Sequence, residues 1–159
     1  MRELRVQTGS AEDTMRLGAA LANCLEAGDV VLLEGPLGCG KTTFVRGLAR
    51  ALGVEGPIRS PSFNLVHEYR TLPPLAHADL YRLTNLEEVK SLGLDDLLVR
   101  HALVLEWPDR APEAFPDDAL WVRFSFVGEV ERDIVLCARG PRSEELLLAV
   151  EELLASGRF

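Results

Sequence analysis

The sequence predicts a three-layer α/β fold with parallel strands at its centre and antiparallel strands at an edge. Two apolar runs, residues 30–33 and 102–105, have the length and composition of buried parallel strands. Helical patterns lie between the predicted strands. From residue 120 the pattern changes to period two, which predicts an antiparallel hairpin with one covered face.

Length and composition indicate a single domain over residues 1–159 that can bury a core. The chain is 47% hydrophobic and 26% charged, which is ordinary for a globular protein. No apolar run approaches the roughly 20 residues needed to cross a bilayer. The charged N-terminus lacks a signal-peptide core, and three scattered cysteines suggest free thiols, so we expect a cytoplasmic protein.

The charge balance argues against a protein that binds nucleic acid by itself. The formal net charge is −8, whereas a nucleic-acid binder needs a basic face. The chain has 15 arginines and only two lysines, Lys41 and Lys90.

In the first half of the chain, residues 4–8 predict a short strand. Ser10 is the expected N-cap of a helix that runs to about residue 27. A strand at 29–34 and a helix ending near residue 52 follow, and Gly53 is a plausible C-cap.

The second half continues the alternation. We expect extended chain at 63–69, a strand at 75–80, short helices near 86–92 and 97–98, and a strand ending at Glu106. Three prolines indicate a long surface loop over 108–116. Leu120, Val122, Phe124 and Phe126 should share one face, which continues after a turn at Gly128-Glu129 with Ile134, Leu136 and Ala138. A helix should occupy 143–155.

A complete Walker A motif lies between the predicted strand at 29–34 and the next helix. Residues 35–42 read Gly-Pro-Leu-Gly-Cys-Gly-Lys-Thr, followed by Thr43. Strand, loop and helix in this order are the context that the motif requires, and they predict a P-loop NTPase fold. The other interpretation, a glycine-rich turn at a helix start, leaves the Lys-Thr pair unexplained.

Each part of this phosphate loop has a physical role. Backbone N–H groups and the helix N-terminus attract phosphate oxygens. Lys41 is expected to reach the β- and γ-phosphates, and the Thr42 hydroxyl to bind Mg²⁺. The residues predicted to bind nucleotide here are Leu37, Gly38, Cys39, Gly40, Lys41, Thr42 and Thr43.

Two carboxylates follow buried strands, Asp79 and Glu106. In a parallel sheet both would lie at the edge that carries the phosphate loop. One carboxylate could then position Mg²⁺ while the other orients an attacking water. The alternative is that each acid caps a helix or pairs with Arg82 or Arg110.

Three other features have more than one interpretation. Residues 60–63 could supply a hydroxyl that senses a γ-phosphate, or form only a turn. Trp107 is predicted to be exposed, where it packs over a ligand or partner or covers the sheet edge. His67, His77 and His101 have no metal or triad spacing, and we interpret them as structural.

Taken together, these segments resemble the TsaE family, also called YjeE, which comprises small bacterial P-loop ATPases needed for threonylcarbamoyladenosine modification of tRNA. The resemblance covers most of the chain. It rests on residues 38–47, on Ser60-Pro61-Ser62-Phe63, on Asp79-Leu80-Tyr81-Arg82-Leu83, on Leu92-Gly93-Leu94 and on Glu106-Trp107-Pro108.

The resemblance implies ATP at the phosphate loop and Mg²⁺ on Thr42, Asp79 and Glu106. It assigns catalytic roles to Lys41, Glu106 and the hydroxyl of Ser62. It also implies a place near the nucleotide for Thr14 and Arg132.

Two residues depart from the family pattern. The family usually has Thr where this chain has Ser62, and Pro36 replaces an acidic or polar residue. Serine keeps the hydroxyl but loses the methyl group, so we expect the role to survive with looser positioning.

The resemblance further implies a function with partners. The ATPase would act on a TsaB–TsaD complex, would be weak alone, and would meet tRNA only through that complex. Two other functions fit a phosphate loop. One is a small-molecule P-loop kinase, which the Pro-rich loop and hairpin at 108–140 disfavour because no helical lid is evident. The other is a non-catalytic, nucleotide-gated binding module.

Overall fold

The computed structural model describes residues 1–61, 65–83 and 85–157. Within these ranges one seven-stranded sheet has the strand order β1-β7-β6-β2-β5-β4-β3. The strands are β1 (Arg2–Thr8), β2 (Val30–Glu34), β3 (Val66–Tyr69), β4 (Leu75–Asp79), β5 (Ala102–Glu106), β6 (Leu120–Phe126) and β7 (Arg132–Ala138). The helices are α1 (Ala11–Ala22), α2 (Lys41–Ala51), α3 (Leu86–Lys90), α4 (Leu94–Leu97) and α5 (Pro141–Ser156).

The sheet directions confirm the predicted fold class. Strands β6, β2, β5 and β4 are parallel neighbours at the centre of the sheet. Strands β3 and β7 run antiparallel to β4 and β6, and β1 pairs antiparallel with β7. The antiparallel pairs therefore lie toward both edges, outside the parallel strands.

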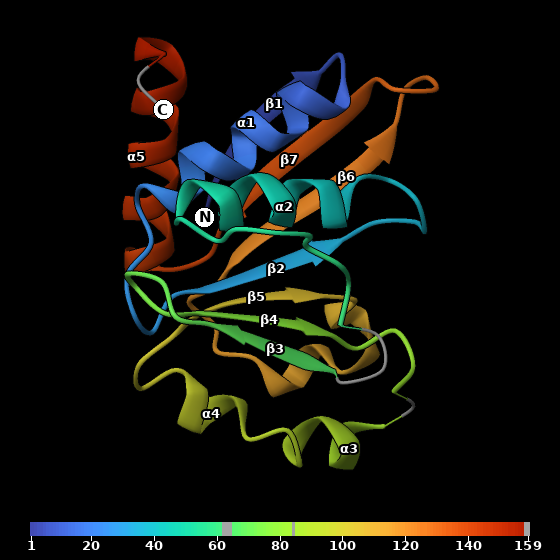
Figure 1. Cartoon of the computed structure of the whole chain (residues 1–159), viewed down its shortest axis with the longest axis vertical. Coiled ribbons are helices and arrows are strands. Elements are labelled where there is room, and N and C mark those ends of the chain that lie inside the picture. Colours follow the sequence, from blue (N-terminus) through green and yellow to red (C-terminus); the bar gives the residue numbers. More distant parts are fainter. Residues whose placement is uncertain (62–64, 84, 158–159) are drawn as a thin grey trace.

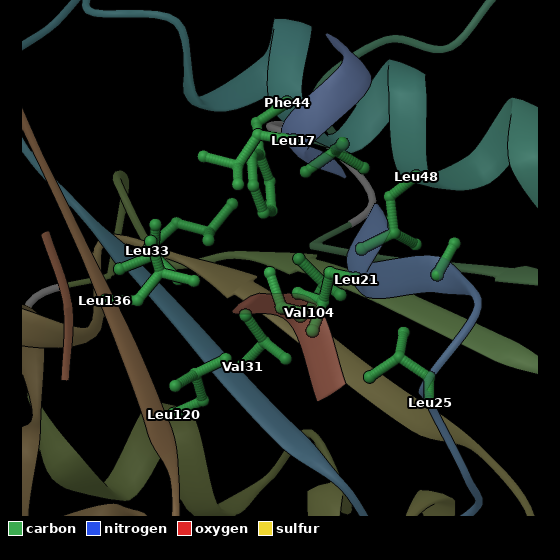
Figure 2. Packing of buried hydrophobic residues seen from close by; sticks show 14 of the residues in the cluster. Leu17, Leu21, Leu25, Val31, Leu33, Phe44, Leu48, Val104, Leu120 and Leu136 are labelled. Atoms are coloured by element: carbon green, nitrogen blue, oxygen red, sulfur yellow. The ribbon is translucent and has the colours of Figure 1, made fainter. Parts of the chain in front are cut away.

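Helices cover the sheet from two sides, which gives three layers (Figure 1). Helices α1, α2 and α5 pack over one face, and α3 and α4 lie on the other. Figure 2 shows the core on the first face, where Leu17 and Leu21 of α1 and Phe44 and Leu48 of α2 meet strand residues such as Val104. This core holds α2 against the sheet directly behind the phosphate loop.

The predicted hairpin is confirmed. Strands β6 and β7 are antiparallel, and the apolar residues of the period-two pattern face each other as pairs. The pairs are Leu120–Ala138, Val122–Leu136 and Phe124–Ile134, and all six side chains are buried. Phe126 was predicted on the same covered face, but it lies opposite Arg132 at the end of the strand and is exposed.

Helix α1 and the proline-rich loop differ from the prediction. The helix predicted to reach residue 27 ends at Ala22, with Asn23 as its C-cap. The Glu26 N–H is satisfied by the Asp29 carboxylate at 2.7 Å, so the chain turns instead of continuing as a helix. The predicted surface loop at 108–116 contains two 3₁₀ turns, η1 (Pro108–Arg110) and η2 (Pro112–Ala114), and Ala111 is buried.

Helices α1 and α2 approach each other closely where both carry glycine. A Cβ on Gly18 would overlap the Phe44 carbonyl, and a Cβ on Gly47 would overlap the backbone of Met15. Only glycine permits this distance between the two backbones. Among the helices of the described ranges, none has the length and apolar character needed to span a bilayer.

Candidate nucleotide-binding site

The phosphate loop connects β2 to α2, as the motif requires. Helix α2 begins at Lys41, and its N-cap Gly40 is left-handed with φ of 106°. Glycine adopts this conformation without strain, and it turns the chain directly into the helix. The N-terminus of α2, with its unpaired N–H groups, therefore opens toward the space above the sheet.

A cavity of about 430 Å³ lies at this helix terminus and brings most of the predicted site residues together. The predicted residues that line it are Leu37, Gly38, Gly40, Lys41, Thr42, Thr43, Thr14, Asp79, Glu106 and Arg132. Cys39 is buried and is not among the lining residues. Ser62 lies outside the described residues.

The two predicted carboxylates are neighbours. Strands β4 and β5 are parallel with Asp79 opposite Glu106, so both strands end at the edge beside the phosphate loop. Both carboxylates are almost fully buried. Thr42 Oγ1 donates to Glu106 Oε1 at 3.3 Å, which links the helix N-terminus to the end of β5.

Asp79 is held by two donors from its surroundings. The Ser60 hydroxyl donates to Oδ2, and the Tyr81 backbone N–H donates to Oδ1 at 2.9 Å. Ser60 also lines the cavity. The sequence predicts a functional hydroxyl within residues 60–63, but nothing in its spacing connects Ser60 to Asp79.

Glu106 has a second partner that the sequence analysis missed. Nε2 of His77 lies 2.6 Å from Glu106 Oε2, and the His77 side chain is fully buried. We interpreted His77 as structural because it has no ligand spacing in the sequence. Its position two residues before Asp79 on the same strand was the one available signal, since alternate residues share a face.

Lys41 contacts the protein itself in this structure. Its Nζ donates to the Gly35 carbonyl at 2.6 Å and lies 3.3 Å from the centroid of the Trp107 ring. Burial lowers the pKa of Lys41, although nearby Glu106 and Asp79 oppose this shift. The ammonium group is therefore partly desolvated and is held at the loop by contacts within the protein.

Trp107 is half-buried, so the prediction that it is exposed is wrong. Its backbone is left-handed with φ of 63°, an uncommon conformation for a bulky residue. The ring packs against Tyr81 with centroids 4.9 Å apart, and Arg110 lies over both rings. Trp107 thus forms a wall of the cavity and covers Lys41.

Arg132 and Thr14 line the same cavity. Arg132 Nε donates to the Cys39 carbonyl at 3.0 Å, and Nη1 donates to the carbonyls of Gly128, Glu129 and Glu131. Arg132 thereby ties the β6–β7 turn to the phosphate loop. Thr14 is buried and shares a 2.9 Å hydrogen bond with Thr8.

The oxygen donors of the site suit magnesium. In the described residues there is no cluster of three or more His, Cys, Asp or Glu side chains that could hold a metal ion by itself. Mg²⁺ typically keeps several waters and takes one or two carboxylates plus substrate phosphates. The Thr42 hydroxyl with Asp79 and Glu106 fits that requirement.

A Walker A loop between a central parallel strand and a helix, with carboxylates at the ends of adjacent strands, defines a P-loop protein. The family model for "Threonylcarbamoyl adenosine biosynthesis protein TsaE" matches residues 8–134. The chain belongs to the TsaE family.

Individual relatives agree with this assignment. A tRNA threonylcarbamoyladenosine biosynthesis protein TsaE of Bacillus subtilis is 36% identical over 148 residues, 92% of each chain. The TsaE protein of Mycobacterium tuberculosis is 40% identical over 139 residues, covering 81% of this chain and 83% of the relative. The crystal structure of YdiB from Bacillus subtilis superposes with a TM-score of 0.83 at 32% identity, over 95% of both chains.

Proposed function

We propose that the protein is a Mg²⁺-dependent ATPase that drives or resets a TsaB–TsaD complex in the threonylcarbamoyladenosine modification of tRNA. One observation carries the ATPase proposal. The Thr42 hydroxyl, buried Glu106 and buried Asp79 converge beside the phosphate loop, in one cavity with Lys41. A site that only bound phosphate would have no need of two buried carboxylates, which repel phosphate oxygens.

Binding would begin at the loop. The N–H groups from Leu37 to Thr43 and the positive end of α2 would receive the phosphate oxygens. Lys41 would exchange the Gly35 carbonyl for the β- and γ-phosphates, because a charged phosphate is the stronger acceptor. Thr14 and Arg132 line the same cavity, and we assign them to its nucleotide-binding wall.

Mg²⁺, when bound, would neutralise charge that develops on the phosphate oxygens. Thr42, Asp79 and Glu106 would hold it, directly or through water. Asp79 is already held by Ser60 and Tyr81, so its carboxylate is fixed before the ion arrives. Fixed ligands favour an ion that demands near-octahedral geometry.

Glu106 would orient the attacking water, since Oε1 faces Thr42 and the cavity. The hydroxyl of Ser62 is proposed to contact the γ-phosphate, as the family resemblance implies.

The family supports the partners and the location that we propose. Its curated members are named for tRNA threonylcarbamoyladenosine biosynthesis, which supports action with TsaB and TsaD and, by inference, in the cytoplasm. The net charge of −8 supports tRNA contact only through the partners.

The decisive test is ATP hydrolysis by the protein alone and with TsaB–TsaD added, with Lys41→Ala as the blank. We expect a weak activity that the pair stimulates and that the variant lacks. If ATP binds but no stimulation occurs, the nucleotide-gated module is the better interpretation. Phosphorylation of a small metabolite in a screen would instead indicate a kinase.

A Glu106→Gln variant separates the proposed role of Glu106 in catalysis from a role in nucleotide binding. Glutamine preserves the shape of the side chain but removes the charge, so turnover should fall by about 10²-fold or more, while the affinity for ATP measured without Mg²⁺ should change little. Turnover and calorimetric affinity measured on the same preparation decide this. If affinity fell as far as turnover, Glu106 would be a binding ligand and would have no catalytic role.

A further inference from the structure

His77 is a buried polar residue that the proposed mechanism has not used. It is the middle residue of β4, opposite Val104 of β5, and its side chain is fully buried. Strands bury apolar residues at such positions, and the other residues of β4 before Asp79 are Leu75, Ala76 and Ala78.

The two ring nitrogens of His77 have unequal environments. Nε2 lies 2.6 Å from Glu106 Oε2. Nδ1 is buried and has no hydrogen-bond partner within the described part of the chain. A buried polar atom without a partner destabilises a fold. A role in stability alone therefore explains this residue poorly, because an apolar residue of the same size would avoid that cost.

The two oxygens of the Glu106 carboxylate have different partners. Oε2 is bound to His77 inside the sheet, and Oε1 accepts from Thr42 at the cavity. Because an ionised carboxylate only accepts hydrogen bonds, this contact requires the ring to donate from Nε2. With Oε2 fixed, the rotation of the carboxylate is fixed as well, and Oε1 must face the loop.

We propose that His77 is a positioning residue that orients Glu106 for turnover by holding Oε2 and presenting Oε1 to Thr42 and the nucleotide. The inference rests on the proposed ATPase function. His77 does not line the cavity and so acts only through Glu106. Partners that orient carboxylates and histidines in this way commonly change activity about 10- to 100-fold when they are removed.

Two substitutions form a matched pair. The amide nitrogen of glutamine lies as many bonds from Cα as Nε2 of histidine, whereas that of asparagine lies one bond closer, at the position of Nδ1. His77→Gln can therefore still donate to Oε2, and His77→Asn cannot. Both variants lose the ring, so its packing contribution is lost in each.

We expect His77→Asn to reduce the turnover of the partner-stimulated ATPase about 10- to 100-fold, with ATP affinity nearly unchanged. His77→Gln should recover most of the turnover at a similar melting temperature. Equal turnover in the two variants at equal melting temperature would overturn the proposal, whether both are active or both inactive. A loss of affinity that matches the loss of turnover would also overturn it.

A second measurement does not require hydrolysis or a folded variant at position 77. In a ring-nitrogen NMR spectrum of the wild-type protein, His77 should be protonated on Nε2, and Glu106→Gln should shift that signal. Protonation on Nδ1, or no response to Glu106→Gln, contradicts the proposal. If the partner pair did not stimulate hydrolysis by the wild-type protein, the ATPase function would be contradicted instead. The NMR spectrum would still show whether His77 donates to Glu106.

Discussion

Lys41 makes two contacts that the proposed nucleotide would have to replace, with the Gly35 carbonyl and with the face of Trp107. Both partners are neutral, whereas a phosphate is an anion that forms charge-assisted hydrogen bonds. Truncation in Lys41→Ala should therefore cost about 2–3 kcal/mol of nucleotide affinity, which is about 30- to 150-fold in Kd. Calorimetric titration with ADP measures this directly.

The chain offers a matched control because its only other lysine, Lys90, is exposed at the end of α3. Lys90→Ala makes the same change in net charge but should leave nucleotide affinity unchanged. If both variants weakened binding equally, the effect would come from the overall charge of the protein and not from the contact in the loop.

At the scale of elements, the close approach of α1 and α2 determines where the phosphate loop lies. A Gly→Ala change inside a helix normally stabilises it by about 1 kcal/mol. At Gly47 the added Cβ would overlap the backbone of Met15, and overpacking of this kind costs about 1–3 kcal/mol. We expect Gly47→Ala to lower the free energy of unfolding, measured in urea.

Arg50→Ala, on the exposed side of the same helix, is the control for that experiment and should change stability by less than about 0.5 kcal/mol. A more stable Gly47→Ala protein would show that the two helices can separate without cost. The phosphate loop would then not depend on their spacing.

Helix α5 is capped by a residue outside it. Gly140 has no side chain to act as the N-cap, and the Asp118 carboxylate accepts from the backbone N–H groups of Arg142 and Ser143 at 2.8 and 2.9 Å. Burial alone would raise the pKa of Asp118, but the hydrogen bonds from Ser143 and Arg142 outweigh it and lower the pKa.

The sign of the pH dependence follows from that lowered pKa. The ionised Asp118 stabilises the fold above the unfolded-state pKa of about 3.9, and this contribution is lost as pH falls through the lower folded-state pKa. Asp118→Ala should cost about 1–2 kcal/mol at pH 7, and the difference from wild type should shrink below about pH 4. Urea unfolding at several pH values tests this, and Asp117→Ala is the control because Asp117 is exposed. If the difference in unfolding free energy between Asp118→Ala and wild type did not depend on pH, a charged cap would be excluded.

Across the whole molecule, local patterns predicted the elements well and contacts between elements less well. The apolar runs and the period-two hairpin depend on burial of one or both faces, which the sequence displays directly. The pairing of β1 with β7 could not be predicted, because strands that are distant in sequence give no local signal of their pairing. The end of α1 was misplaced because its turn depends on the Asp29 side chain.

The site residues fall into the same two groups, those that local patterns predict and those whose contacts depend on the complete fold. Lys41, Thr42, Asp79 and Glu106 were predictable because a loop motif and the ends of parallel strands place them at one edge. His77 and Ser60 were not, since their bonds to Glu106 and Asp79 join residues 29 and 19 positions apart. Those contacts exist only through the register of β4 and β5 and the path of the loop that carries Ser60.

The charge of the whole chain bears on the proposal that it contacts tRNA only through its partners. Binding to a nucleic acid depends on releasing counterions from its phosphates, and a protein with a net charge of −8 has a repulsive field to overcome. We therefore expect no tRNA binding by the protein alone at about 0.15 M salt, and co-migration with tRNA only when TsaB–TsaD is present. An electrophoretic mobility assay at several salt concentrations measures both. Binding of the isolated protein that weakened steeply with salt would reveal a basic surface of its own and would contradict the indirect role.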